Sequence, residues 1–371
     1  MGALCQSKNT KTSFDVLTNR KSCAIILSTV DEKGGSMASI KQFVERRDNI
    51  ASIVSYVRGV GFATRLEISS ALSLSWACVS DLVALLIERN VLTESTQKTE
   101  RSESEARGRT PTCVKLNGKK YFLGVDINDS GIAITRLSID GAVMDRKKWE
   151  AESFCDEKAL TGSVCSKIEE MLLDRDDCCG IGVAMEGMRA GSNSWFYPFA
   201  TGVESFSPVE VLGKYFGLPV CARHDPECML YAVANDIETD CMAVRIDNGI
   251  GVAAMKNGRI LDLPFELGFI RCGGKKLKSV LADAKSSGDY SSFAIELGYA
   301  VGNLAMLLGI DRVYIVGEIA EWFDKIENGF KKSFGEVDGR IEYEVRYVTD
   351  ASEGAARIVA AEYPFLEEYI K

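Results

Sequence analysis

The sequence predicts an α/β body of two lobes that follows a small winged helix-turn-helix domain. Between residues 47 and 89, apolar side chains recur at three- and four-residue spacings, which is the period of amphipathic helices. After Lys120 the pattern changes to short apolar strands that alternate with helices to the end of the chain. A chain of 371 residues is long enough for two or three domains, each with its own core.

Composition and cysteine usage are those of a soluble protein. Hydrophobic residues make up 46% of the chain and charged residues 26%, and no run of 18 apolar residues indicates a membrane span. The apolar patch at residues 24–27 is too short for a signal peptide. The 12 cysteines lack the paired spacing of a disulfide framework, which predicts reduced thiols and a cytoplasmic location.

The charge is unevenly distributed along the chain. Residues 1–116 carry 16 Lys and Arg against 12 Asp and Glu, a net of +4, whereas the whole chain has a net charge of −9. The remainder is therefore strongly acidic, which excludes a chain that binds nucleic acid throughout. A mildly basic head on an acidic body fits a DNA-binding domain that is carried by a separate soluble domain.

Residues 46–116 form the predicted DNA-binding domain, and residues 1–45 are expected to be a flexible extension with a short helix from Ile40. The expected elements are helices over about 47–58, 65–72 and 76–89, a strand at 90–93, a polar run at 94–109 and a strand at 112–116. Three helices followed by a hairpin with a long polar tip is the winged helix-turn-helix arrangement. A helical oligomerisation module is the alternative.

The start of the third helix holds the residues predicted to reach base edges in a major groove. Ser75 is the expected N-cap, and the candidates for base contact are Ser75, Trp76, Ala77, Ser80 and Asp81. Residues in the first turns of such a helix are the ones that enter the groove.

Two pairs of arginines are expected to contribute to DNA binding. Arg58 and Arg65 are expected to contact phosphates. Arg107 and Arg109 flank a glycine just before a strand, and two guanidinium groups so placed suit a narrow minor groove. A charged interdomain linker is the alternative interpretation of this Arg-Gly-Arg segment.

Residues 117–371 form the predicted body. Its expected elements are strands at 121–127, 132–138, 180–185, 219–223 and 312–316, a turn at 140–141, a hairpin of 241–246 and 251–255 with turn residues at 256–258, and a helix at 292–308. Alternating strands and helices predict an α/β architecture of two lobes.

Several short motifs follow one another in this body. They are YFLGVDI at 121–127, GIGVAMEG at 180–187, GLPV at 217–220 with His224 and Asp225 after it, NGIG at 248–251, ELG at 266–268 and EGAA at 353–356. Together with the helix-turn-helix and the Arg-Gly-Arg-x-Pro element, they resemble the repressor branch of the ROK family (repressors, open reading frames and sugar kinases), over roughly residues 47–360.

The resemblance implies a fold and a function. The fold is the two-lobed, actin-like sugar-kinase fold, which is a ribonuclease H-like ATPase fold. The function is that of a DNA-binding transcriptional regulator, a repressor of sugar-metabolism genes, that binds a double-stranded DNA operator as a homodimer or homotetramer. The alternatives are an ATP-dependent ROK sugar kinase and a non-enzymatic dimerisation or interaction protein.

The zinc motif of the family is degraded in this sequence. The resemblance implies a zinc site, because kinases of the family hold zinc with one His and three Cys in a GH…CxCGxxGC stretch. Here Phe269 stands at the His position, Cys272 is the one thiol that remains, and His224 is the single histidine of the chain. No metal is therefore expected.

The phosphate-binding turns of the family are degraded as well. A glycine-rich DxGGT turn follows the first strand in the family, whereas this chain has DINDSG at residues 126–131. Asp129 in this turn and Glu318 after Gly317 place carboxylates where a triphosphate would lie. No ATP cofactor and no kinase activity are therefore expected.

A sugar pocket is expected to remain. Asp225 matches the position of the family's catalytic base, His224 stands at the position of the family's Asn, and Glu266 keeps its carboxylate. With Gly187 they are the candidates for binding a sugar or sugar phosphate effector. The alternative is that Asp225 only caps the helix expected at 226–234.

Overall fold

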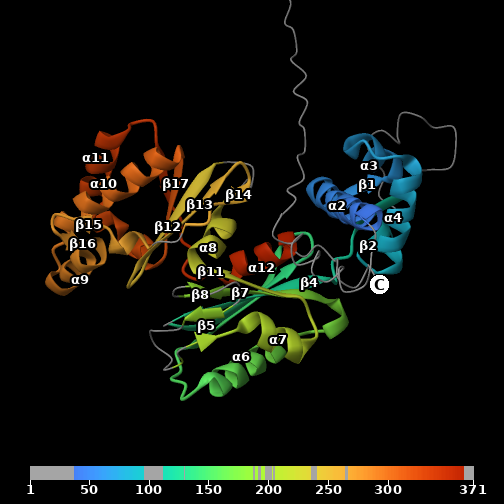
Figure 1. Cartoon of the computed structure of the whole chain (residues 1–371), viewed down its shortest axis with the longest axis horizontal. Coiled ribbons are helices and arrows are strands. Elements are labelled where there is room, and N and C mark those ends of the chain that lie inside the picture. Colours follow the sequence, from blue (N-terminus) through green and yellow to red (C-terminus); the bar gives the residue numbers. More distant parts are fainter. Residues whose placement is uncertain are drawn as a thin grey trace, which may run out of the picture.

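The computed structural model describes most of the chain. The described residues are 37–95, 112–128, 130–186, 189–190, 194–196, 203, 205–234, 240–263 and 266–362. They form a helical head and a body of two lobes, and the head and the second lobe lie on opposite sides of the first lobe (Figure 1).

The head combines three helices with a small antiparallel sheet. Its elements are α2 (Met37–Val60), β1 (Phe62–Thr64), α3 (Arg65–Leu72), α4 (Trp76–Glu88), β2 (Leu92–Ser95) and β3 (Cys113–Leu116). The strand order is β1-β3-β2. Val57, Ile68, Val83 and Leu86 are among the fully buried side chains of its core. The predicted winged helix-turn-helix is thus confirmed, although α2 begins earlier than expected and β1 is a strand that was not predicted.

Local hydrogen bonds fix where α3 and α4 begin. The Thr64 hydroxyl accepts from the Glu67 backbone N–H at 3.2 Å, and the Glu67 carboxylate accepts from the Thr64 N–H at 2.8 Å. Ser73 ends α3 in the left-handed region at φ 53°. The Ser75 hydroxyl then accepts from the Cys78 N–H at 3.2 Å, so Ser75 is the N-cap of α4, as predicted.

The first lobe is built on a five-stranded sheet in the order β11-β7-β4-β5-β6. The strands are β4 (Tyr121–Asn128), β5 (Gly131–Ser138), β6 (Val143–Glu150), β7 (Cys178–Met185) and β11 (Val220–His224). Helices α6 (Glu157–Met171) and α7 (Pro208–Phe216) lie on one face of the sheet, and α8 (Asp225–Val233) and α12 (Ser352–Glu362) on the other (Figure 1). Short strands β8 (Arg189–Ala190), β9 (Ser194–Phe196) and β10 (Ser205–Phe206) form a separate antiparallel sheet.

The second lobe repeats this topology in the order β14-β13-β12-β17-β18. Its strands are β12 (Cys241–Ile246), β13 (Ile250–Lys256), β14 (Arg259–Ile260), β17 (Arg312–Val316) and β18 (Glu342–Val345), and its main helices are α9 (Leu277–Ser287), α10 (Ser291–Leu308) and α11 (Glu327–Val337). In each lobe an antiparallel meander is extended by two parallel strands. This duplicated ribonuclease H-like unit is the predicted actin-like fold.

The hairpin of β12 and β13 differs in one detail from its prediction. The turn between these strands is formed by residues 247–249, and Asn257 and Gly258 instead connect β13 to β14. Asn257 adopts the left-handed region at φ 50°, which suits a tight turn. The turn residues were therefore recognised correctly but assigned to the wrong pair of strands.

Helix α12 packs directly against the backbone of the first lobe through three glycines. A Cβ at Gly124 of β4 would overlap the Ser352 carbonyl oxygen, and a Cβ at Gly182 of β7 would overlap that of Ala355. A Cβ at Gly354 of α12 itself would overlap the carbonyl oxygen of Cys228 in α8. These glycines belong to the motifs that suggested the family, and their role is close packing.

Helix α10 is the one described element whose length and apolar composition would allow it to cross a membrane. Its Phe293, Leu297 and Val301 side chains are fully buried in the core of the second lobe. Its Gly298 and Gly302 bring the backbone close to α11. Packing within the lobe thus accounts for the apolar character of this helix.

The head is joined to the first lobe by side chains as well as by the chain itself. The Arg58 Nε donates to the Ile139 carbonyl oxygen at 2.9 Å, at the turn between β5 and β6. The Asn117 amide donates to the Asn90 carbonyl oxygen at 2.7 Å. Arg58 was expected to contact DNA phosphate; it is half-buried and its Nε is engaged by the first lobe, and a phosphate contact by its other N–H groups stays a prediction.

Candidate functional site

The first candidate site is the exposed start of α4 in the head. Trp76 is 60% exposed, Ala77 and Asp81 are also exposed, and Ser80 is half-buried. The opposite face of α4 is buried through Val79, Leu82, Val83 and Leu86. The predicted contact residues therefore share one accessible face, and Arg65 is half-buried at the start of α3.

The wing supplies the second predicted DNA contact. Strands β2 and β3 pair antiparallel, with Ser95 opposite Cys113, so the tip of the wing follows Ser95. Arg107 and Arg109 belong to this tip and lie outside the described residues. Their contribution to DNA binding stays a prediction.

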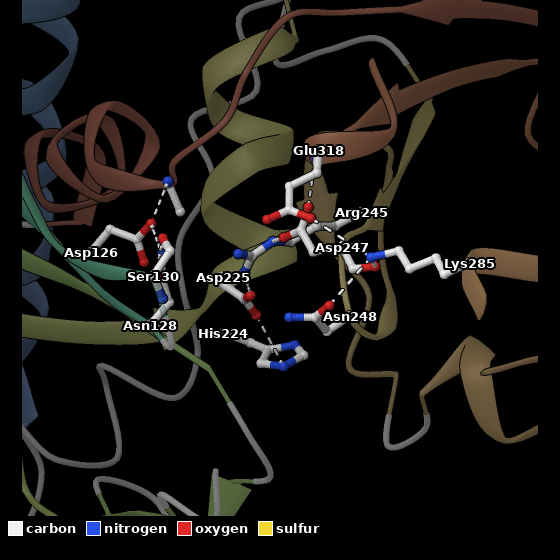
Figure 2. Close-up of polar contacts among 11 residues, drawn as sticks. Asp126, Asn128, Ser130, His224, Asp225, Arg245, Asp247, Asn248, Lys285 and Glu318 are labelled. Carbon is white, nitrogen blue, oxygen red and sulfur yellow. Dashed lines mark hydrogen bonds and ion pairs between the residues drawn. The ribbon is translucent and has the colours of Figure 1, made fainter. Parts of the chain in front are cut away.

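The second candidate site lies between the two lobes and contains three of the four predicted ligand-binding residues, of which Figure 2 shows His224 and Asp225. His224 ends β11, Asp225 begins α8, and Glu266 precedes a short helical turn of the second lobe. The His224 Nε2 lies 3.2 Å from an oxygen of Asp225 and 3.2 Å from an oxygen of Glu266. The structure thus brings these three side chains together, whereas Gly187 lies outside the described residues.

Asp225 does not cap α8, which was the alternative interpretation of this residue. The N-cap position is His224, and Asp225 is the first helical residue, followed by Pro226. The Asp225 side chain is 6% exposed and forms an ion pair with Arg245 of β12. Its carboxylate therefore points into the space between the lobes instead of toward the helix backbone.

Arg245 is the central cation of this site, and the sequence did not single it out. It stands in the buried strand Cys241–Ile246, and its side chain is 8% exposed. Besides the Asp225 ion pair, its Nε donates to the carboxylate of Asp247. The sequence did offer one signal for Arg245, because it is the single charged residue in an otherwise apolar strand. A buried charge requires a partner of opposite charge or a hydrogen-bond acceptor.

Asp126 of β4 is a fully buried carboxylate at the edge of the same site. One of its oxygens accepts from the Asn128 amide and from the Ala351 backbone N–H, both at 2.9 Å. The other oxygen, Oδ1, has no hydrogen-bond partner among the described residues. Burial raises the pKa of Asp126 to about 6, an effect that Arg245 partly opposes.

Replacing Asp126 with Asn is expected to remove a pH dependence of stability. The pKa of Asp126 is about 6 in the folded state and 3.8 ordinarily, so the folded protein binds the proton more tightly than the unfolded chain. The free energy of unfolding therefore falls as the pH rises between these two pKa values, and it stays at the lower value at higher pH. The Asn side chain keeps an acceptor for Asn128 and Ala351. We expect Asp126→Asn to raise the free energy of unfolding at pH 7.5 by up to about 3 kcal/mol.

Urea unfolding at pH 4 and pH 7.5 measures this difference. Asp338→Asn is the control, because Asp338 is a surface residue whose pKa is lowered to about 2 by Arg340, and it should give no gain at pH 7.5. A variant Asp126→Asn that is less stable than the native chain at both pH values would contradict the prediction.

The turns that the resemblance assigns to phosphate binding make polar contacts with one another (Figure 2). The Asp247 carboxylate accepts from the Glu318 backbone N–H at 2.6 Å. Lys285 donates to the Asp247 carbonyl at 2.9 Å and to the Asn248 side chain at 3.2 Å. In the first lobe, the Asn128 side chain accepts from the Ser130 N–H at 2.8 Å. These donors therefore already have acceptors within the protein, and carboxylates stand beside them.

Phe269 and Cys272 stand where the resemblance places the family's zinc motif. The Phe269 ring stacks with two cations, Lys276 at 4.9 Å and Lys278 at 4.1 Å from its centroid. Burial and the neighbouring Glu296 raise the pKa of the Cys272 thiol, which favours the neutral form over the thiolate that binds metal. The described residues contain no group of three His, Cys, Asp or Glu side chains arranged to hold a metal ion.

Comparisons of sequence relate the chain to bacterial proteins. No family model matches it. It is 22% identical over 227 residues to an uncharacterized protein of Sinorhizobium fredii, covering 58% of this chain and 55% of that protein. It is 23% identical over 236 residues to the DNA-binding transcriptional dual regulator NagC of Escherichia coli K12, covering 61% and 55%. The chain thus spans about half the length of the curated relatives it matches.

Comparisons of structure agree with this relationship. A ROK family transcriptional regulator, described as a homolog of the E. coli MLC protein, superposes with a TM-score of 0.70 at 17% identity, over 86% of this chain and 98% of that one. The ROK family glucokinase of Streptomyces griseus superposes with a TM-score of 0.51 at 15% identity, over 64% of this chain and 98% of that one. The chain therefore has the fold of these ROK family proteins, with a winged helix-turn-helix head in front of a body that resembles their sugar-kinase-like part.

Proposed function

We propose that the protein is a DNA-binding transcriptional regulator, a cytoplasmic repressor of sugar-metabolism genes. It would bind a double-stranded DNA operator as a homodimer or homotetramer, because one winged helix reads too few base pairs and two-fold symmetry matches a palindrome. The observation that carries the proposal is the accessible start of α4, where Trp76 and Ala77 face outward on a helix anchored by its buried side.

The similarity to regulators supports the same proposal. The ROK family transcriptional regulator matches the head as well as the body, whereas the glucokinase matches a smaller share of the chain. NagC, a relative by sequence, is a DNA-binding transcriptional regulator. A fold alone does not define a function, so the head is the feature that separates the two classes within this family.

The geometry between the lobes argues against kinase activity. A sugar kinase needs a carboxylate that accepts the proton of a sugar hydroxyl and a set of N–H donors for the phosphates. Here the Asp225 carboxylate is engaged by Arg245, and the Glu318 N–H is engaged by Asp247. The body would therefore bind neither ATP nor zinc and would serve for dimerisation and for sensing of an effector.

The effector would be a sugar or a sugar phosphate at the opening between the lobes. His224 and Glu266 are partly exposed, with 20% and 25% of their side chains accessible, and they lie on different lobes. A ligand that contacts both would favour one arrangement of the lobes over another. Titration of a protein–operator complex with a sugar panel tests this step, and unchanged affinity with every sugar would contradict it.

The function itself is tested by selection of genomic DNA fragments with the full-length protein. Enrichment of a palindromic sequence, with affinity that falls steeply as salt rises, is the expected result. The Arg107→Ala, Arg109→Ala double variant should bind the enriched fragment more weakly and with a smaller salt slope. Weak binding without sequence preference would contradict the proposal and leave the head as an interaction module.

A further inference from the structure

The accessible face of α4 consists mainly of apolar and small side chains. Trp76, Ala77, Asp81 and Ala84 are exposed on it, and Ser80 is half-buried beside them. The helix lies on the side of the head that points away from the second lobe (Figure 1). Its whole sequence, WACVSDLVALLIE, contains no Arg, Lys, Asn or Gln. This composition limits which base edges the helix can recognise.

The missing residue types are the ones that read purines through pairs of hydrogen bonds. Arg and Lys bind the O6 and N7 atoms of guanine, and Asn and Gln bind the N6 and N7 atoms of adenine. The Asp81 carboxylate only accepts hydrogen bonds, so it cannot bind the two acceptors of guanine. Apolar contact remains, and it is the way in which alanine and aromatic side chains recognise the C5 methyl group of thymine.

Trp76 offers the largest apolar surface for such a contact. It is the first helical residue after the N-cap Ser75, and it is 60% exposed, whereas Trp149 and Trp322 are half-buried. The opposite face of α4 fills the core of the head, so the indole contributes little to folding. A side chain in the first turn of a reading helix is placed to reach base edges. The indole is therefore available for contact with a base.

The positive charge of the head lies outside this helix. Residues 1–116 have a net charge of +4, and the arginines expected to contact phosphates or the minor groove belong to α3 and to the wing. Contacts with phosphates fix the position of a protein on DNA but carry no sequence information. Recognition of bases in the major groove is therefore left to the start of α4.

We propose that α4 recognises its operator through the C5 methyl groups of thymines, which Trp76 and Ala77 contact in the major groove. This inference rests on the proposed function and extends it, because it names the base that is read and the side chains that read it. Each half-site of the operator then places a thymine at the start of α4. Removal of its methyl group weakens binding even though base pairing is unchanged.

The test compares two forms of the operator that the full-length protein enriches. One contains thymine, and in the other uracil replaces every thymine of both half-sites, which removes only the C5 methyl groups. Burial of one such group is worth about four-fold in affinity, so with a contact in each half-site we expect a loss of about ten-fold or more by fluorescence anisotropy. 5-Bromouracil, whose bromine is similar in size to a methyl group, should restore most of the affinity.

Two variants show whether the methyl group acts through the indole. Trp76→Ala should bind the thymine operator about ten-fold more weakly, and uracil should then cost it less than about three-fold, because the main contact is already absent. Trp76→Phe keeps an aromatic ring and should retain most of the affinity and of the uracil effect. Trp76 is exposed, so both variants should unfold at the native temperature.

The Arg107→Ala, Arg109→Ala double variant is the matched control. Its loss of affinity should be the same for the thymine and the uracil operator, because neither a phosphate nor the minor groove contains the C5 methyl group. The native ratio of about ten-fold or more between the two operators should therefore persist in this variant. A ratio that disappears here as well as in Trp76→Ala would assign the effect to general weakening of the complex and would overturn the inference.

The remaining outcomes separate this inference from the proposed function. Sequence-specific binding that is equally tight with thymine and uracil would overturn the inference and leave the proposed function intact. An undiminished uracil effect in Trp76→Ala would also overturn it, since the methyl groups would then act through the shape of the DNA. Binding of the thymine operator without sequence preference would overturn both, and that result is obtained before uracil is used.

Discussion

Replacing Ala77 with Asp is expected to lower the affinity for the enriched operator by about 100-fold. Ala77 is exposed in the first turn of α4, where side chains reach base edges and adjacent phosphates. A carboxylate at this position repels the negatively charged phosphates. Inside the groove it also faces base-edge acceptors, which carry partial negative charge. One lost specific contact is worth about 1–3 kcal/mol, and the added repulsion increases that loss. Fluorescence anisotropy with labelled operator measures the effect.

Ala282→Asp is the matched control for this change. Ala282 is an exposed alanine within helix α9 of the second lobe, far from the head (Figure 1). The same substitution there changes net charge equally, so operator affinity should change less than about two-fold. Equal losses in both variants would show that net charge matters and the α4 surface does not. Native affinity in Ala77→Asp would remove α4 as the reading helix.

Replacing Gly354 with Ala is expected to destabilise the body by about 3 kcal/mol or more, because the new methyl group overlaps a backbone carbonyl oxygen. That carbonyl belongs to Cys228 in α8, and α8 also carries Asp225 into the space between the lobes. A backbone atom cannot move aside by changing a rotamer, so α12 or α8 must shift. Urea unfolding followed by circular dichroism measures the loss.

Gly162→Ala is the control for helical glycines in general. Gly162 lies within helix α6, and a Cβ at this position meets open space. Alanine restricts the unfolded chain and favours the helix, so this variant should be more stable than the native chain by about 0.5–1 kcal/mol. If Gly354→Ala were also neutral or stabilising, the close contact between α12 and α8 would be refuted.

Periodic and local signals made much of the fold predictable. The apolar stripe of α4 and the N-cap at Ser75 are consequences of side-chain chemistry within a few residues, and both were predicted correctly. The strands Tyr121–Asn128 and Cys178–Met185 are buried along their length and show as apolar runs. Strand β6 was missed because its Val143–Glu150 sequence is polar and exposed at the edge of the sheet.

The candidate site was predictable in part. Similarity of motifs identified His224, Asp225 and Glu266 as neighbours, and they do lie within hydrogen-bond distance of one another. The same reasoning missed Arg245, because the motifs describe what the family retains and not what replaces a lost function. It also did not foresee the contact of Arg58 with Ile139, which is 81 residues away in the sequence.

The sequence by itself determined the local elements and the order of the motifs, because these depend on residue type and short spacing. The tertiary structure alone decided which charges meet. Asp225 lies on a helix of the first lobe and Arg245 on a strand of the second, and only the packing of those lobes brings these two buried charges into contact. Since the energy of a charge depends on its burial and on its neighbours in space, no pattern along the chain reveals it.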